Sequence, residues 1–527
     1  MWQNDWRNRI WVRLGDPWDI IVVGGGITGA GILREAARLG LRALLVEKKD
    51  FSWGTSSRST KLVHGGLRYL KQGQFGVTYH SVRERERLLR EGPGLVEPLG
   101  FLMATYEGDT SRRVFGTGLA LYDLFASRRD HQYYAADDFQ MLAPHVSTQK
   151  LEGGFRYGDA LTDDARLVLR IIREAVLDGA TALNYAAAER LLLDGDGHVN
   201  GVRLRDQVAD RATEVHAAVV INATGAWADR LRLQVGGQAQ IRPSRGSHLI
   251  FPAWRFPAAQ AITLWHPDDH RPVFVIPWEG VTLVGTTDLD HQQPLDEEPQ
   301  IDSGETTYLM AALEARFPKL HLGLHDVLAS FAGIRPILGT GKANPSKESR
   351  AHTALVDKGL ITVTGGKLTT YRLMVRDTLK AAAGSLPVLR AADETAPCLN
   401  PVPPALVGAP ASMDGAVHRR LLGRYAADAE ALVAAALPGE LERIPGTSSL
   451  WAELRWGARD EGVVHLDDLL LRRVRLGLLL PQGAVPLLHR IRAIVQPELG
   501  WSDILWEREV TRYAEIWAKG YGVPDSS

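Results

Sequence analysis

Cysteine is almost absent from this chain of 527 residues, since Cys398 is the single example. One thiol cannot form an intramolecular disulfide, a Cys-x-x-Cys redox pair or a thiolate metal cluster. An excess of charge of one sign is also missing, because 61 Lys and Arg residues face 62 Asp and Glu residues, for a formal net charge of -1. The chain therefore lacks the basic field typical of nucleic-acid-binding proteins, and we expect no nucleic-acid partner.

Long apolar runs are missing too. No stretch approaches the roughly 20 apolar residues that a membrane-spanning helix needs, and the start of the sequence has no apolar segment of the signal-peptide kind. We expect a protein of a reducing, cytoplasmic environment that is dissolved or attached to a membrane surface. A chain of 527 residues is long enough for two or three domains.

The first segment, 1–18, is unusual because tryptophan alternates with arginine, a combination that suits a lipid interface. The residues concerned are Trp2, Trp6, Arg7, Arg9, Trp11, Arg13 and Trp18. Two interpretations stay open from the sequence: an arm that touches a membrane, and an arm that packs on its own protein.

A nucleotide-binding motif follows this arm. An apolar run at 19–23 enters Gly24-x-Gly26-x-x-Gly29, residues 27–39 have helical spacing, and 42–46 are apolar again before Glu47. This order predicts strand, turn, helix and strand. The glycines let a pyrophosphate approach the helix N-terminus, and Glu47 is placed to accept hydrogen bonds from a ribose. A turn made only for packing is the alternative, and the motif alone does not choose between NAD and FAD.

A second glycine turn favours FAD. Residues 360–364 predict a buried strand, which is followed by Gly365-Gly366 and by a helix from about 368 to 382. A helix N-terminus favours the negative charge that gathers near N1 and O2 of a reduced flavin. One flavin that contacts both turns is the economical interpretation.

Residues 54–69, from Gly-Thr-Ser-Ser to Gly-Gly-Leu-Arg-Tyr, are similar almost position for position to a signature of the FAD-linked glycerol-3-phosphate dehydrogenases. In that family the signature follows the nucleotide motif. The chain also resembles the family at 222–227, 246–248, 276–278, 285–288, 333–336, 365–371 and 466–473. The arm at 1–18 departs from the family pattern.

The resemblance implies an α/β fold. We expect an FAD-binding Rossmann-like domain of the glutathione-reductase/D-amino-acid-oxidase type, an inserted antiparallel β-sheet substrate domain and a helical C-terminal domain. The predicted segments are 19–87, 156–240 and 333–385 for the FAD-binding domain, 88–155 and 241–332 for the substrate-binding domain, and 386–527 for the C-terminal domain.

The resemblance also implies the catalytic residues. His248 is the expected base for the substrate hydroxyl, because histidine has a pKa near operating pH, although an isolated strand histidine is more often a packed or surface residue. Arg335 is expected to stabilise charge developing on oxygen. The substrate and its phosphate are expected to meet Arg68, Tyr69, Arg350 and Lys367. For any one arginine, a solvated salt bridge is the plain alternative.

The expected cofactor contacts come from several motifs. They are Gly24, Gly26, Thr28, Gly29, Glu47, Thr55, Ser56, Ser57, Lys61, His64, Ala223, Thr224, Gly225, Gly333, Gly366, Lys367, Leu368 and Thr369. No metal is implied, since a flavin needs none to take a hydride.

The implied activity is oxidation of sn-glycerol 3-phosphate to dihydroxyacetone phosphate by hydride transfer to FAD, with reoxidation by a membrane quinone. A quinone partner implies a peripheral position on the inner face of the cytoplasmic membrane. Three alternatives stay open: an oxidase that uses O2 and produces H2O2, an amine or hydroxy-acid oxidase of the same fold, and a flavin-binding protein without turnover. Oligomeric state is not set by the sequence, and a homodimer is one open assembly.

Overall fold

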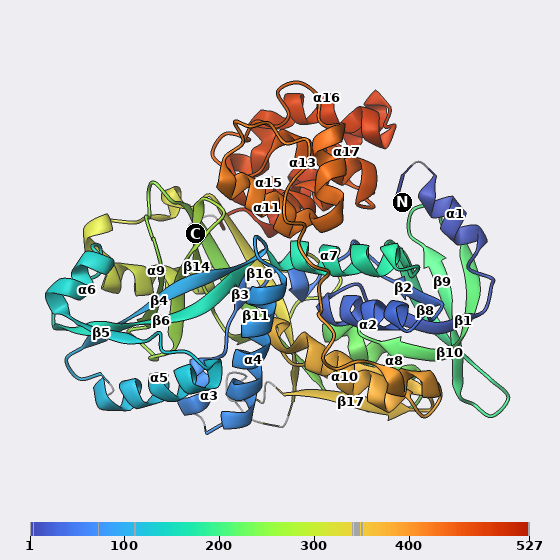
Figure 1. Cartoon of the computed structure of the whole chain (residues 1–527), viewed down its shortest axis with the longest axis horizontal. Helices are drawn as coiled ribbons and strands as arrows, with labels where there is room; N and C mark the ends of the chain where they lie inside the picture. Colours follow the sequence, from blue (N-terminus) through green and yellow to red (C-terminus); the bar gives the residue numbers. More distant parts are fainter. Residues whose placement is uncertain are drawn as a thin grey trace.

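The computed structural model describes residues 2–3, 5–71, 73–109, 112–339, 341, 348 and 351–524, except for the side chains of Arg68 and Lys71. Two large sheets and a helical domain make up this part of the chain (Figure 1). Within it, no helix combines the length and the apolar character needed to cross a bilayer.

The first sheet carries the nucleotide motif. Its strand order is β17-β18-β10-β1-β2-β7, with β8 and β9 joined to β10. The bounds are β1 Trp18–Val23, β2 Ala43–Val46, β7 Thr181–Leu183, β8 Ala186–Leu193, β9 Val199–Asp206, β10 Ala212–Asn222, β17 His352–Asp357 and β18 Leu360–Gly365. The pairs of β1 with β2 and β10, of β10 with β18 and of β2 with β7 are parallel. Such strands are covered on both faces, which explains their nearly continuous apolar runs.

The helices beside this sheet are α2 (Ile27–Arg38), α7 (Asp164–Leu177) and α10 (Tyr371–Ala382). The predicted strand–turn–helix–strand order around the first glycine motif is confirmed. The helix predicted at 368–382 begins as a 3-10 turn, Leu368–Thr370, before α10. The predicted α/β class is therefore correct.

The second sheet is mainly antiparallel, with the order β15-β11-β14-β13-β12-β4-β6-β3 and with β16 paired to β11 and β5 to β6. The bounds are β3 Leu62–Val63, β4 Val96–Tyr106, β5 Gln132–Ala135, β6 Leu151–Thr162, β11 Ile241–Pro252, β12 Ala261–Trp265, β13 Pro272–Trp278, β14 Val281–Gly285, β15 Leu289–Asp290 and β16 Ala329–Leu338. One pair, β12 with β4, is parallel. Around the sheet lie α3 (Leu67–Lys71), α4 (Phe75–Glu91), α5 (Arg112–Ala126), α6 (Ala136–Leu142) and α9 (Ser303–Arg316).

A helical domain covers one end of both sheets (Figure 1). It contains α11 (Gly415–Tyr425), α12 (Ala429–Ala435), α13 (Trp451–Asp460), α14 (Leu466–Asp468), α15 (Leu476–Leu479), α16 (Leu488–Leu499) and α17 (Asp503–Gly520). Buried ion pairs attach it to the first sheet: Arg473 Nη1 lies 2.6 Å from Asp50 Oδ2, and Arg424 Nη2 lies 2.7 Å from Asp163 Oδ2. The exact domain boundaries given above stay predictions.

The tryptophan-rich arm packs on its own protein. Trp2, Trp6 and Trp18 are buried, and α1 (Trp6–Val12) lies beside the first sheet. Trp2 Nε1 donates to the carbonyl of Ala182 at 3.4 Å, and Arg7 forms an ion pair with Asp206 at 2.6 Å. Of the two interpretations of the arm, packing is the one that fits these contacts.

Candidate active site

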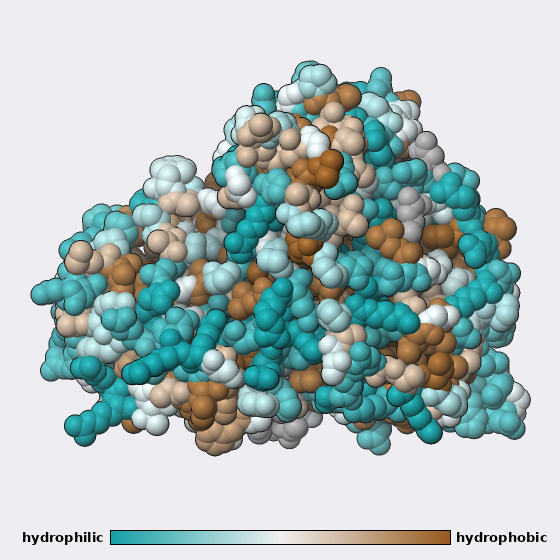
Figure 2. Space-filling model, viewed as in Figure 1, coloured by the Kyte–Doolittle hydropathy of each residue, from teal (hydrophilic) through white to brown (hydrophobic). Residues whose placement is uncertain are grey.

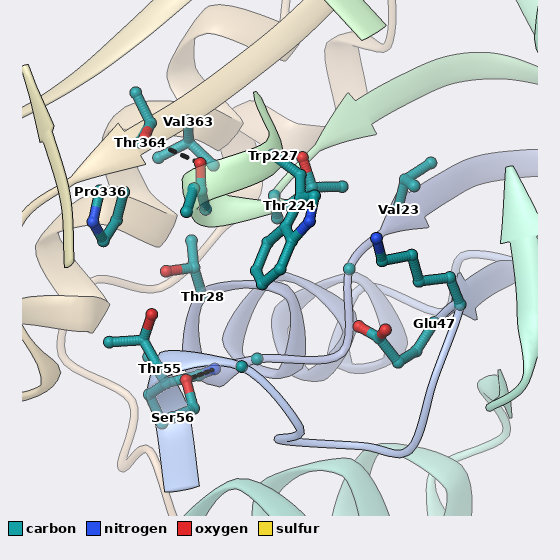
Figure 3. Close-up of a pocket in the computed structure, with 18 of the residues that line it drawn as sticks. Val23, Thr28, Glu47, Thr55, Ser56, Thr224, Trp227, Pro336, Val363 and Thr364 are labelled. Atoms are coloured by element: carbon teal, nitrogen blue, oxygen red, sulfur yellow. Dashed lines mark hydrogen bonds between the residues drawn. The ribbon is translucent and has the colours of Figure 1, made fainter. Parts of the chain in front are cut away.

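A cavity of about 490 Å³ opens at the carboxyl ends of the parallel strands (Figure 3). In open α/β sheets this edge is where ligands bind. Twelve of the predicted cofactor contacts line it: Gly24, Gly26, Thr28, Glu47, Thr55, Ser56, Ala223, Thr224, Gly225, Gly366, Lys367 and Leu368. The two glycine turns thus meet at one cavity, as a single long cofactor requires.

The first turn is closely packed below the cavity. Gly24 has φ +114°, and a Cβ there would lie 2.6 Å from the carbonyl oxygen of Ala223. A Cβ on Gly29 would lie only 1.9 Å from the oxygen of Gly24. Only glycine therefore fits at these two positions. The tight turn that they permit leads directly into α2, and the N-terminus of a helix favours an anion. Ser56 Oγ accepts from Ile27 N at 3.0 Å and joins the next motif to this helix.

Glu47 stands at the end of β2, as predicted. Its Oε2 accepts from Gly25 N at 2.8 Å and its Oε1 from Lys49 N at 2.9 Å. Burial raises the pKa of this carboxyl. Because the side chain also lines the cavity, its remaining acceptor positions suit ribose hydroxyls. The glycine cradle, the helix N-terminus and this carboxyl together fit an FAD.

Trp227 and Asp296 form one wall of the cavity, and neither is among the predicted contacts. The Trp227 ring lies between Thr28 and Glu47 in Figure 3, and Trp227 Nε1 donates to Asp296 Oδ1 at 2.9 Å. Asp296 also pairs with Lys48 and Arg230. Burial raises the pKa of Asp296, but these two cations outweigh it and hold the pKa at about 2. Trp227 belongs to a family-like stretch that could have suggested it, whereas Asp296 lies in no motif.

Six predicted cofactor contacts do not line the cavity: Gly29, Ser57, Lys61, His64, Gly333 and Thr369. Lys61 is fully buried, and its Nζ donates to Asp164 Oδ2 at 2.9 Å and to the carbonyl of Ser57 at 2.6 Å. Burial lowers the pKa of Lys61 to about 7. A direct cofactor contact for these six residues stays a prediction.

His248 lies in the middle of β11, opposite Gly285 of β14 and Phe331 of β16. Its Nε2 is 3.0 Å from Thr60 Oγ1, and its Nδ1 is buried without a hydrogen-bond partner among the described residues. Burial, and then the nearby charges of Arg335 and Lys61, hold the pKa of His248 well below its usual value. The imidazole is therefore neutral near pH 7 and able to accept a proton.

Arg335 lies on β16 and shares one sheet face with His248. A Cβ on Gly246 would come within 2.0 Å of Arg335 Nη2, so the guanidinium lies directly over that glycine. Nη2 donates to Thr286 Oγ1 at 2.9 Å, and Nη1 to Asp288 Oδ1 at 3.2 Å. β16 borders the cavity, since Pro336 lines it and Thr55, which also lines it, donates to the carbonyl of Ile334.

The predicted substrate residues divide into two groups. Lys367 Nζ lies 4.1 Å from the centre of the Tyr69 ring and donates to Ser81 Oγ at 2.9 Å. These contacts bring two of the predicted residues together beside the second glycine turn. The side chain of Arg68, in α3, and the whole of Arg350 lie outside the described residues.

Two family models match the chain. The model described as FAD dependent oxidoreductase matches residues 19–372, and the one described as the C-terminal domain of alpha-glycerophosphate oxidase matches residues 381–504.

Curated relatives agree with these matches. A glycerol-3-phosphate dehydrogenase of Mycobacterium leprae is 34% identical over 533 residues, which is 96% of this chain and 89% of the relative. An aerobic glycerol-3-phosphate dehydrogenase of Staphylococcus aureus is 37% identical over 370 residues, which is 69% of this chain and 66% of the relative.

Solved structures are similar as well. The glycerol-3-phosphate dehydrogenase of Bacillus halodurans complexed with FAD has a TM-score of 0.79 and 28% identity, covering 99% of this chain and 98% of its own. The L-alpha-glycerophosphate oxidase of Mycoplasma pneumoniae with FAD bound has a TM-score of 0.56 and 18% identity, covering 70% of this chain and 95% of its own. This second likeness concerns the fold alone.

Proposed function

Because the chain belongs to the family of FAD-dependent glycerol-3-phosphate dehydrogenases, we propose that it oxidises sn-glycerol 3-phosphate to dihydroxyacetone phosphate. One observation carries the proposal: a neutral, buried His248 shares a sheet face with Arg335, and β16, the strand of Arg335, borders the cavity that fits FAD. Bound FAD supplies the acceptor for the hydride that leaves the substrate carbon. The two glycine turns, Glu47 and the Thr55–Ser56 turn would hold it.

His248 is the proposed base for the C2 hydroxyl. Thr60 Oγ1 pairs with Nε2, so Nδ1 is the ring nitrogen left without a partner among the described residues, and we assign the incoming proton to it. For Nδ1 to hold a lone pair, Nε2 carries the ring proton and donates it to Thr60. The low pKa of His248 keeps this nitrogen unprotonated before substrate binds.

Cationic side chains would bind the negatively charged substrate. Arg335 already donates to Thr286 and Asp288, which fixes its guanidinium on the same face as His248. Lys367 lines the cavity beside Tyr69 and has an ammonium suited to phosphate. Arg68 and Arg350 complete the predicted substrate set.

The proposed electron acceptor is a membrane quinone, and the proposed location is the inner face of the cytoplasmic membrane. The relatives are named dehydrogenases and not oxidases, which favours an acceptor other than O2. The match to the C-terminal domain of alpha-glycerophosphate oxidase favours the second candidate, an oxidase that passes electrons to O2.

Anaerobic mixing with sn-glycerol 3-phosphate tests the reaction. The flavin absorbance at about 450 nm should bleach and return when a quinone analogue is added. A protein that stays yellow would exclude the substrate assignment. Hydrogen peroxide formed in air in a one-to-one ratio with product, with no reoxidation by the quinone analogue, would establish the oxidase instead.

A further inference from the structure

A fully buried carboxylate lies behind the sheet face that His248 and Arg335 share, which we call the catalytic face. Hydrophilic side chains cover much of the surface in Figure 2, and carboxylates are normally found there. Glu305 is an exception, because it is only 1% exposed although it belongs to the first turn of α9. This helix packs on the second sheet against β11, the strand of His248. An acidic side chain is almost never buried in this way unless its oxygens are paired.

Both oxygens of this carboxylate are paired twice. Oε1 accepts from Ser247 Oγ at 2.8 Å and from Thr287 Oγ1 at 2.5 Å. Oε2 accepts from Asp302 N at 3.2 Å and forms an ion pair with Arg245 Nη2 at 2.9 Å. An ionised carboxylate offers about four acceptor positions, so Glu305 is fully satisfied inside the protein. A buried polar network that is fully satisfied holds its members rigidly.

Two of these partners belong to the strand of His248. Successive residues of a strand point to opposite faces, so Arg245 and Ser247 of β11 lie on the face away from His248. The pairing of β11 with β16 places Arg335 on the same face as His248. Glu305 therefore contacts β11 from behind the catalytic face, at the residue that directly precedes the proposed base.

Thr287 connects Glu305 to Arg335 through the sheet. It lies in the segment 286–288, which leads from β14 to β15, and both of these strands pair with β11. Behind the catalytic face, the Thr287 hydroxyl donates to Glu305 and accepts from Ser247 N at 2.9 Å. On the catalytic face, the Thr287 carbonyl accepts from Nη1 and Nη2 of Arg335, each at 3.3 Å. Arg335 also donates to the side chains of the other two residues of this segment, so the segment holds the guanidinium in place.

The N-terminal cap of α9 accounts for only one of the two carboxylate oxygens. Asp302 is the N-cap residue: its Oδ1 accepts from Glu305 N at 2.9 Å, and its own N–H donates to Glu305 Oε2. Oε1 takes no part in this cap, and it is the oxygen that contacts Ser247 and Thr287. The start of the helix therefore does not explain why two hydroxyl groups from the second sheet donate to Oε1.

We propose that Glu305 is a positioning residue whose Oε1 fixes the separation between His248 and Arg335. The inference rests on the proposed function, in which His248 takes the substrate proton and Arg335 stabilises charge on the same substrate. Besides burial, the charges of Arg335 and Lys61 lower the pKa of His248. A loosened segment 286–288 would let Arg335 withdraw, which would both misplace the guanidinium and raise the pKa of the base.

Thr287→Val tests the proposal in the full-length holoenzyme, because valine has nearly the shape of threonine and lacks the hydroxyl. We expect kcat/KM for sn-glycerol 3-phosphate to fall by up to about 10²-fold, the effect of a small misplacement of reacting groups. The acidic limb of kcat/KM should also move to higher pH. Thr287→Ser keeps the hydroxyl and should retain the wild-type values of both. Asp302→Ala is the control for the helix cap: it should lower stability toward urea and leave both kinetic readouts unchanged.

An NMR titration of the His248 imidazole gives a readout that needs no turnover. In protein with isotope-labelled histidine, the His248 signal is the one that His248→Ala lacks. The imidazole should become protonated at higher pH in Thr287→Val than in wild type. This shift, in a protein whose flavin sn-glycerol 3-phosphate does not bleach, would keep the positioning contact and exclude the proposed function. The proposal is overturned if Thr287→Val keeps the wild-type titration of His248 or, in an active protein, the wild-type kcat/KM.

Discussion

The imidazole of His248 lies flat against the ring of Phe331, with ring centroids 4.6 Å and planes 15° apart. The two residues are cross-strand neighbours on β11 and β16, so the sheet itself fixes the orientation of the imidazole. With Thr60 at Nε2, the ring is held on two sides, and a base held in this way loses little entropy when substrate binds.

His248→Ala should slow anaerobic flavin reduction by about 10²- to 10⁴-fold, the usual contribution of a positioned base. FAD content should stay at the wild-type level, because His248 does not line the cofactor cavity. Stopped-flow absorbance on protein of matched flavin content measures the change. A rate within a few fold of wild type would exclude His248 as the base.

The pH dependence of kcat/KM should reflect the low pKa of His248. A base with a depressed pKa stays unprotonated as pH falls through 6.5, so activity should persist there and decline only at lower pH. Arg335→Gln removes one of the cations that lower this pKa. The acidic limb should then move to higher pH, besides any loss of rate. An acidic limb at the same pH in both proteins would contradict the electrostatic coupling.

Gly246→Ala should weaken substrate binding. The new methyl group would lie 2.0 Å from Arg335 Nη2, and the guanidinium would have to move away from the face it shares with His248. Overpacking of this kind costs about 1–3 kcal/mol, and we expect KM to rise more than kcat falls. Gly384→Ala is the control, because a Cβ there meets no atom within 4 Å. Equal kinetics for the two variants would show that Arg335 does not need this space.

The fold could be predicted from the sequence where the pattern is local. The glycine motif, the apolar strands around it and Glu47 each follow from residues within one βαβ unit, and their structure agrees with the prediction. In the wall made by Trp227 and Asp296, the family-like stretch 222–227 could have suggested Trp227. Asp296 could not be predicted, because a hydrogen bond and an ion pair bring it to the cavity from a segment far away in the chain. The burial of Lys61 was missed for a similar reason, since its partner Asp164 begins a distant helix.

Asp50→Asn should destabilise the contact between the first sheet and the helical domain. Asp50 is fully buried between Arg472 (2.5 Å) and Arg473 (2.6 Å), and asparagine would remove the charge that both guanidinium groups share. Arg472 would keep Asp467 and Asp468, whereas Arg473 has no other ion pair among the described residues. Breaking a buried ion pair from one side costs about 3–5 kcal/mol. Urea unfolding of the holoenzyme measures the change. The exposed pair of Asp16 and Arg42 provides the control, since Asp16→Asn should change stability by less than about 1 kcal/mol.

Trp2→Ala should lower the free energy of unfolding and leave flotation with anionic vesicles at the wild-type level. The indole is buried, lies 5.7 Å from the Phe51 ring, and donates to Ala182, so its removal leaves a cavity between the arm and the first sheet. Truncation of a buried tryptophan costs about 3–5 kcal/mol. If the arm instead reached into lipid, the same variant would float less with anionic vesicles and unfold at the wild-type urea concentration. Flotation and urea unfolding of one preparation therefore decide between an arm that packs and an arm that binds membrane.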